Sequence, residues 1–108
     1  MKPVFFCGDT LEQIRAFPAD VRQDAGFQIH KLQRGELPDD WKPLTTAGQG
    51  VKELRIKAES GHYRVIYLAS QANAIYVVHA FVKKTRKTRK ADISLTRKRL
   101  KDLGNQHG

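Results

Sequence analysis

Three stretches with strand-forming composition follow one another in the second half of the chain, and only short turns separate them. Residues 51–57 alternate charged and apolar side chains, residues 62–68 are rich in strand formers, and residues 75–82 are almost continuously apolar. The turns fall at Ser60–Gly61 and Gln71–Ala72–Asn73. Because turns this short join adjacent strands, we expect the three stretches to form an antiparallel meander.

One strand and two helices are expected before the meander. Residues 3–7 have strand-like composition, Asp9 or Thr10 can cap a short helix, and Pro18 separates that helix from a second one that ends near Gly35. Apolar positions at helical spacing mark the inner faces of the two helices: Leu11, Ile14, Phe17, Val21, Ala25, Ile29 and Leu32. The order predicts an α+β fold, with an antiparallel sheet (the meander plus the N-terminal strand) backed by the two N-terminal helices. The second face of the sheet is expected to be open.

Two further segments complete the predicted organisation. Residues 36–50 contain several prolines and glycines and are predicted to be a loop, in which Trp41 either packs on the core or stacks on a base. Residues 91–103 are predicted to form a basic C-terminal helix with a thin apolar stripe and with Thr88 as a candidate cap, and residues 104–108 are expected to fray.

The composition limits the class of protein. A chain of 108 residues is enough for one domain, so residues 1–108 are expected to form a single unit. The single cysteine, Cys7, cannot form an intramolecular disulfide, and no apolar run approaches the ~20 residues that cross a bilayer. These features favour a cytoplasmic protein without a membrane partner.

The net charge of +9 is concentrated at the C-terminal end. Residues 1–82 contain ten Lys/Arg and nine Asp/Glu, whereas residues 83–108 contain ten Lys/Arg and two Asp/Glu. Clustered positive charge attracts polyanions and releases counterions when it binds them, which makes nucleic acid the expected partner. The alternative is a solvated, unstructured basic tail.

Two arginines lie on consecutive strands of the expected meander. A short turn between the strands would bring Arg55 and Arg64 into neighbouring positions, where their guanidinium groups suit a phosphate. The alternative is a structural salt bridge, because Glu53 lies on the same strand face as Arg55.

A run of cations follows the central strand directly. Lys83, Lys84 and Lys87 emerge from a rigid element, which is a good position for functional side chains. Further candidates for RNA contact are Arg86, Arg89, Lys90 and, as a stacking ring, Phe81, although a core role for Phe81 is also open. His79 and His62 are each either a general base or an ordinary strand residue.

The histidines and the single cysteine do not have the spacing of a metal site, and no glycine-rich phosphate loop is present. Any enzymatic activity is therefore expected to need no metal and no cofactor. RNA cleavage is compatible with this, because the 2′-hydroxyl can attack the adjacent phosphate. Catalysis then requires proton removal, stabilisation of the phosphorane and a proton for the leaving oxygen. A lysine whose pKa is lowered by neighbouring cations can remove the proton.

The order of these pieces resembles the phage-derived Gp49-like/HigB branch of the RelE/ParE toxin superfamily over roughly residues 3–103. The resemblance is carried by three motifs in sequence: Gly48-x-Gly50-Val51-x-Glu53-Leu54-Arg55, Tyr63-Arg64-Val65-Ile66-Tyr67 and His79-x-Phe81-x-Lys83-Lys84-Thr85-x-Lys87-Thr88. The last motif is the most specific. One departure is Arg89, where the family often has proline.

This resemblance implies a RelE-like toxin of a type II toxin–antitoxin system that cleaves mRNA on the ribosome and so inhibits translation. It implies a cognate antitoxin, often a helix-turn-helix protein, which we expect to cover or reshape the basic surface. The family's functional positions correspond to Arg55, Arg64, Lys83, Lys84 and Lys87. Two alternatives stay open: a ParE-like inhibitor of DNA gyrase without nuclease activity, and a plain nucleic-acid-binding module.

Overall fold

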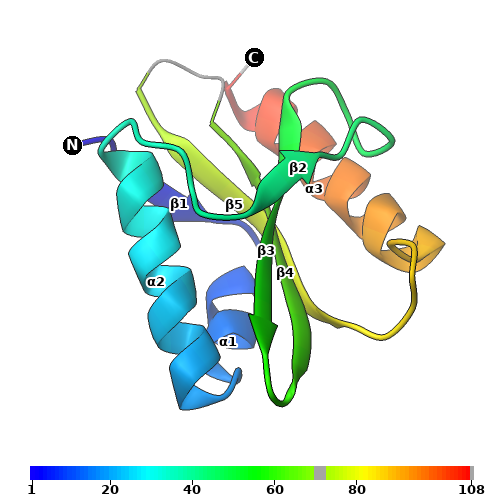
Figure 1. The fold of residues 1–108 in the computed structure, drawn as a ribbon. Helices are drawn as coiled ribbons and strands as arrows, with labels where there is room; N and C mark the ends of the chain where they lie inside the picture. The colour runs from blue at the N-terminus through cyan, green and yellow to red at the C-terminus, as the bar shows by residue number, and fades with distance from the viewer. Residues whose placement is uncertain (70–72, 108) are drawn as a thin grey trace.

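The computed structural model describes residues 1–69 and 73–107, and a five-stranded sheet is its central layer (Figure 1). The strand order is β1-β5-β4-β3-β2. The bounds are β1 Val4–Phe6, β2 Trp41–Pro43, β3 Val51–Ala58, β4 Gly61–Leu68 and β5 Ile75–Lys83. The helices are α1 Thr10–Arg15, α2 Ala19–Gln33 and α3 Lys90–His107.

The predicted antiparallel meander is confirmed. Strand β3 pairs antiparallel with β4, and β4 pairs antiparallel with β5. The turn at Ser60–Gly61 is also confirmed, and Gly61 has a φ of 143°, which L side chains rarely adopt. The second predicted turn includes Gln71 and Ala72, which lie outside the described residues. A register shift between Ile66 and Tyr67 places Val78 as an extra residue in β5.

The sheet has two features that the sequence did not predict. The N-terminal strand was expected to belong to an antiparallel sheet, but β1 pairs in parallel with β5. Parallel pairing requires a long connection, and the two helices and the strands β2 to β4 lie between β1 and β5. Residues 41–43, predicted to be part of a loop, form the edge strand β2 against β3. An edge position tolerates Pro43, which has no backbone N–H to donate to a further strand.

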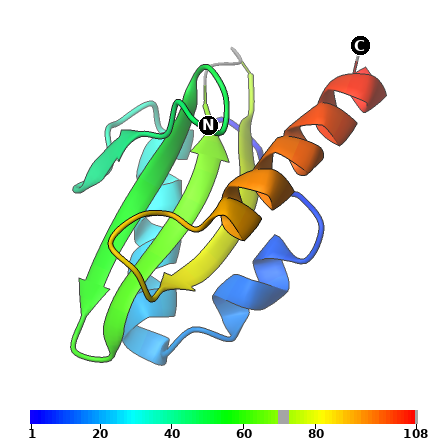
Figure 2. The same cartoon turned by 90° about the vertical axis from the view of Figure 1, so that its right-hand side faces the viewer.

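The first core lies between the sheet and the two N-terminal helices, as predicted. Figure 2 shows α2 on one side of the sheet and α3 on the other. The side chains of α1 and α2 meet every second residue of β3 and β4, which is the pattern of a strand with one face buried. The buried members of this first core are Ile14, Phe17, Val21, Ala25, Ile29, Leu32, Leu54, Ile56, Tyr63, Val65, Tyr67, Ile75, Val77 and Ala80.

The second face of the sheet is not fully open, which corrects the expectation from the sequence. A second cluster covers one end of this face, and α3 packs on it through Ile93 and Leu100. The other cluster members are Leu44, Ala47, Val51, Ile66, Phe81 and Leu68. The thin apolar stripe of α3 suffices for docking because polar contacts supplement it.

Arg99 supplies the main polar contact of α3. Its guanidinium donates to the Val78 carbonyl at 2.9 Å and to the Thr10 hydroxyl at 3.2 Å, and it forms an ion pair with Asp9 at 2.5 Å. Gly8 adjoins this anchor with a φ of 56°, and a Cβ there would lie 2.8 Å from the guanidinium. Arg99 therefore joins α3 to β5 and to the start of α1.

Helix α3 is longer than predicted. It begins one residue before the predicted start and continues to His107 rather than ending near Leu103. The backbone of residues 104–107, where the sequence predicts fraying, is helical, and residue 108 lies outside the described residues. None of the helices in the described part of the chain has the length and apolar content to cross a membrane.

Replacing Arg99 by alanine should loosen α3. The Val78 carbonyl and the Thr10 hydroxyl would both lose a donor, which costs about 1–3 kcal/mol for a buried group. The measurement is urea unfolding, together with hydrogen exchange of the α3 amides. The exposed neighbour Lys98→Ala removes the same charge and should change the free energy of unfolding by no more than about 0.5 kcal/mol. Equal losses in both variants would contradict this role for Arg99.

Candidate functional site

Cross-strand pairing brings the two predicted arginines together. Arg55 on β3 lies directly opposite Arg64 on β4, and Arg64 lies opposite Phe81 on β5. Two residues nearer the β3–β4 turn, in the next row on the same face of the sheet, His62 lies opposite Lys83. The prediction that Arg55 and Arg64 are neighbours is therefore confirmed.

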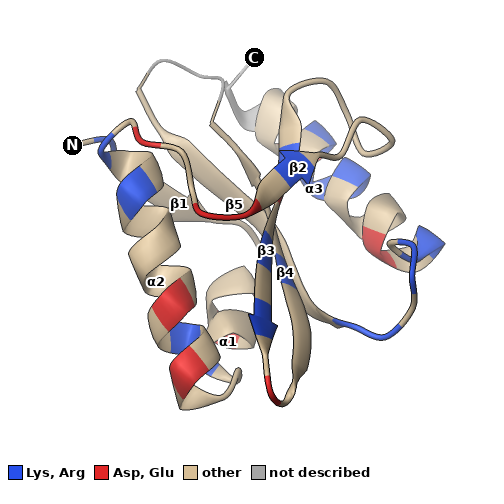
Figure 3. Ribbon diagram, in the orientation of Figure 1, with Lys and Arg blue, Asp and Glu red and all other residues tan. Residues whose placement is uncertain are grey.

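A hollow of about 450 Å³ lies over these rows, at the end of the sheet that α3 leaves uncovered. Five cationic side chains and one histidine line it, and its lining includes no carboxylate: Arg55, His62, Arg64, Lys83, Lys84, Thr85 and Arg86. Figure 3 shows basic residues on β3 and β4 and along the connection from β5 to α3. We call this hollow the first hollow. Its charge suits a phosphate group.

A buried carboxylate lies beneath the arginines. The side chain of Glu53 is fully buried, and its Oε1 lies 3.2 Å from the Nε of Arg64, which is 5% exposed. The contact is an ion pair and not a well-aligned hydrogen bond, whereas Arg64 Nη1 donates to the Tyr63 carbonyl at 3.0 Å. The structural salt bridge that the sequence left open is thus formed by Arg64.

Arg55 differs from Arg64 in its ion pairing. No carboxylate in the described part of the chain forms an ion pair with it, and its buried Nε has no hydrogen-bond partner among those residues. Arg55 also lines the first hollow, where no lining carboxylate offsets its charge. The guanidinium of Arg55 is therefore suited to an incoming anion.

The pKa of Lys83 is lowered in this environment. Burial is the main cause, repulsion from Arg64 lowers the pKa further, and Glu53 opposes the shift. The pKa of Arg64 is also lowered, mainly by burial, while attraction to Glu53 raises it. A guanidinium stays charged in proteins, but an amine with a lowered pKa can release its proton and act as a base.

The connection from β5 to α3 is attached to the same carboxylate. The hydroxyl of Thr88 donates to Glu53 Oε2 at 2.9 Å, and the hydroxyl of Thr85 donates to the Lys87 carbonyl at 2.6 Å. Thr88 was a candidate helix cap, but its hydroxyl bonds Glu53 instead, and the Arg89 carbonyl accepts from Ile93 at the start of α3. Glu53 therefore positions both Arg64 and the cationic connection.

The remaining predicted site residues, including Lys87, which was predicted to be catalytic, are dispersed. Lys87 lies next to the first hollow but does not line it, Arg89 contacts Asp92 at 3.3 Å, and Lys90 is exposed at the start of α3. Phe81 is 9% exposed in the second core cluster, which is the packing role rather than the stacking role.

The positions of His79, Trp41 and His62 in the structure bear on the alternative roles that the sequence left open for each. His79 is 7% exposed, stacks on Phe81 and donates to Asp92 at 2.8 Å, so it helps to hold α3 on the sheet. Trp41 is half-buried on β2 with the Lys52 ammonium 5.1 Å from its ring centre. His62 lines the first hollow, although the sequence marked it only weakly; its position two residues before Arg64 on one strand face was the available signal.

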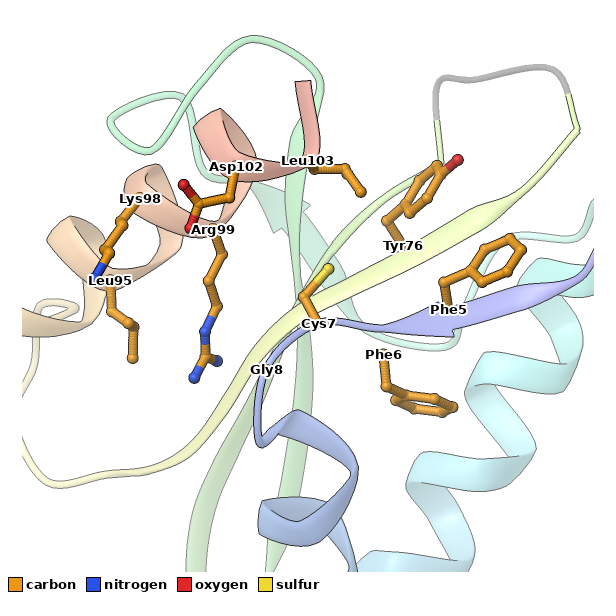
Figure 4. Close-up of a pocket in the computed structure, with 10 residues that line it drawn as sticks. All are labelled: Phe5, Phe6, Cys7, Gly8, Tyr76, Leu95, Lys98, Arg99, Asp102 and Leu103. Carbon is orange, nitrogen blue, oxygen red and sulfur yellow. The ribbon is translucent and has the colours of Figure 1, made fainter. Parts of the chain in front are cut away.

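A larger hollow of about 560 Å³ lies between β1, β5 and α3 (Figure 4). Its lining is mainly apolar, and its one arginine, Arg99, already has partners. Burial raises the pKa of the Cys7 thiol there, although Arg99 opposes the shift, and a raised pKa disfavours the nucleophilic thiolate. This hollow therefore lacks the chemistry of the first.

The side chains of the described residues include no group of three or more His, Cys, Asp and Glu that could hold a metal ion.

Residues 12–101 of the chain match the family model described as "Phage derived protein Gp49-like (DUF891)". The matched region contains all the residues that line the first hollow. A search of curated proteins found no match.

Replacing Glu53 by glutamine should destabilise the fold strongly. Removing one partner of a buried ion pair leaves the other charge uncompensated, which costs about 3–5 kcal/mol. The free energy of unfolding from denaturant titration measures the effect. Glu59→Gln, in the exposed β3–β4 turn, is the matched control and should unfold like the wild type.

A second variant keeps the test interpretable if Glu53→Gln does not fold. The double substitution Glu53→Leu with Arg64→Met replaces the pair by apolar side chains, and such exchanges are often neutral or stabilising. We expect it to recover most of the lost stability. A Glu53→Gln protein as stable as the wild type would show that the ion pair does not hold the site together.

Proposed function

The chain belongs to the phage-derived Gp49-like family, a family of RelE/HigB-type toxins, and from that premise we propose that it is a toxin that cleaves mRNA on the ribosome. The observation that carries the proposal is the first hollow, whose lining includes Arg55, without an ion-pair partner among the described residues, and Lys83, a lysine of lowered pKa, but no carboxylate. Such a hollow attracts an RNA phosphate and also contains a base.

The proposed reaction is an internal transesterification of RNA. The amine of Lys83 accepts the proton of a 2′-hydroxyl, whose oxygen then attacks the adjacent phosphorus. The bond from phosphorus to the 5′-oxygen of the next nucleotide breaks, and the ammonium of Lys84 donates a proton to that leaving oxygen. The products are a 2′,3′-cyclic phosphate and a 5′-hydroxyl end.

The arginines have the electrostatic role in this mechanism. Arg55 donates to the equatorial oxygens of the phosphorane, and Arg64, oriented by Glu53, donates beside it. Preorganised donors of this kind stabilise the developing charge without reorganisation during the reaction. Lys87, Arg86, Arg89 and Lys90 bind the RNA backbone outside the reacting bond.

Membership of the family supports a proposal for the biological setting. We propose that residues 1–108 act as one domain in the cytoplasm, that ribosome-bound mRNA is the substrate, and that a cognate antitoxin, a helix-turn-helix protein, covers or reshapes the first hollow. An antitoxin complex in which Arg55, Arg64 and residues 83–87 remain open and unchanged would contradict this mode of inhibition.

Substituting the base should abolish cleavage while sparing the fold. Lys83→Met removes the proton acceptor, and loss of a general base slows a reaction by about 10²–10⁴-fold. The assay is cleavage of mRNA on programmed ribosomes by the purified protein, with analysis of the RNA ends. Lys101→Met, which removes an exposed lysine from α3, is the control and should cleave at the wild-type rate.

Two results would contradict the proposal. Equal cleavage by Lys83→Met and Lys101→Met would exclude Lys83 as the base. A wild-type protein that leaves mRNA intact but causes trapped gyrase breaks in DNA would favour the ParE-like inhibitor of gyrase over the nuclease.

The cleavage rate should rise with pH as Lys83 loses its proton. Because the pKa of Lys83 is lowered, the rise should occur at a lower pH than for an ordinary lysine. Arg55→Gln removes one of the charges that lower this pKa, so its profile should shift to higher pH in addition to losing rate. Single-turnover rates measured across pH test both statements. A rate that falls steadily from neutral pH upward would exclude a lysine base.

A further inference from the structure

A second hollow of about 340 Å³ adjoins the first and is also lined by the β5–α3 connection. The two hollows share Lys83 and Arg86, so a ligand that extends beyond the first hollow meets the second directly. The outer wall of this second hollow comes from β2 and the residues that follow it, a segment that the sequence did not mark as functional.

The lining of the second hollow has the chemistry of a nucleotide site. Lys42 and Lys87 supply positive charge, and Thr45 and Thr46 supply hydroxyl donors. Its lining also contains apolar side chains, among them Leu44, but no carboxylate. Cations and hydroxyls bind phosphate, whereas an apolar surface accepts the face of a base or a ribose.

The position of Lys42 distinguishes a role in RNA binding from the ordinary role of a lysine on an edge strand. An exposed lysine on an edge strand often serves only to prevent pairing with another sheet. Lys42, however, lies opposite Glu53 in the β2–β3 register, lines the second hollow, and is close enough to Lys83 to lower its pKa. Its charge therefore acts on the cationic surface rather than on the sheet edge alone.

We propose that the second hollow binds the nucleotide next to the one cleaved, so that single-stranded RNA runs from the first hollow, past residues 83–87, to the segment 42–46. The inference rests on the proposed function, because it extends the same RNA strand. Single-stranded RNA suits this path, since its unstacked bases can turn into separate hollows.

The test uses salt-dependent binding of RNA that cannot be cleaved. The probe is a single-stranded oligonucleotide of about ten nucleotides with 2′-O-methyl groups, within the range of single-strand site sizes. The proteins are the wild type, Lys42→Ala and the control Lys101→Ala, all with intact catalytic residues. Loss of one phosphate contact should reduce the slope of log K against log salt by about 0.7 for Lys42→Ala and leave it unchanged for Lys101→Ala.

The outcomes separate this inference from the nuclease proposal. A Lys42→Ala slope equal to that of the wild type overturns the proposal that the second hollow binds RNA, even if the wild type cleaves mRNA. A reduced slope in Lys42→Ala alone supports it, even if the wild type proves not to cleave. Equal slope losses in Lys42→Ala and Lys101→Ala would mean that net charge binds the RNA, and would also overturn it.

Discussion

The buried ion pair between Glu53 and Arg64 is the constraint on which the rest of the site depends. A carboxylate that is fully buried requires a cationic partner and further hydrogen bonds, because desolvation of an isolated charge is prohibitive. Glu53 obtains both, from Arg64 in the sheet and from Thr88 in the connection to α3. One side chain thereby determines where an arginine points and where a run of lysines lies.

The positive charge that Glu53 does not neutralise is concentrated at one end of the sheet face on which α3 packs. Helix α3 covers the other end through Ile93 and Leu100 and is held by His79 and Arg99. The uncovered end contains cations that exceed the single buried carboxylate, so Arg55 has no ion-pair partner among the described residues. The pKa of Lys83 is lowered there, mainly by burial and further by repulsion from Arg64. A surface of this kind is unfavourable until an anion binds, and that is the physical basis for assigning RNA to it.

Local sequence patterns predicted the fold well and the site in part. Alternation and short turns were sufficient for the meander and for the contact between Arg55 and Arg64, because register follows from turn length. They were not sufficient for the partner of Glu53, since Thr88 lies 35 residues away, or for the docking of α3, since Arg99 and Asp9 are separated by 90 residues. Side-chain pairs at such separations leave no periodic signal. Strand β2 was missed because three residues containing a proline do not alternate.

The central claim is that the first hollow cleaves mRNA on the ribosome, and mapping of mRNA 5′ ends in cells tests it most directly. The protein is expressed under tight control, once with translation running and once with translation blocked. New 5′ ends inside translated frames that disappear when ribosomes are blocked are the predicted result. Growth arrest without new 5′ ends, or new ends that persist without translation, would contradict the claim.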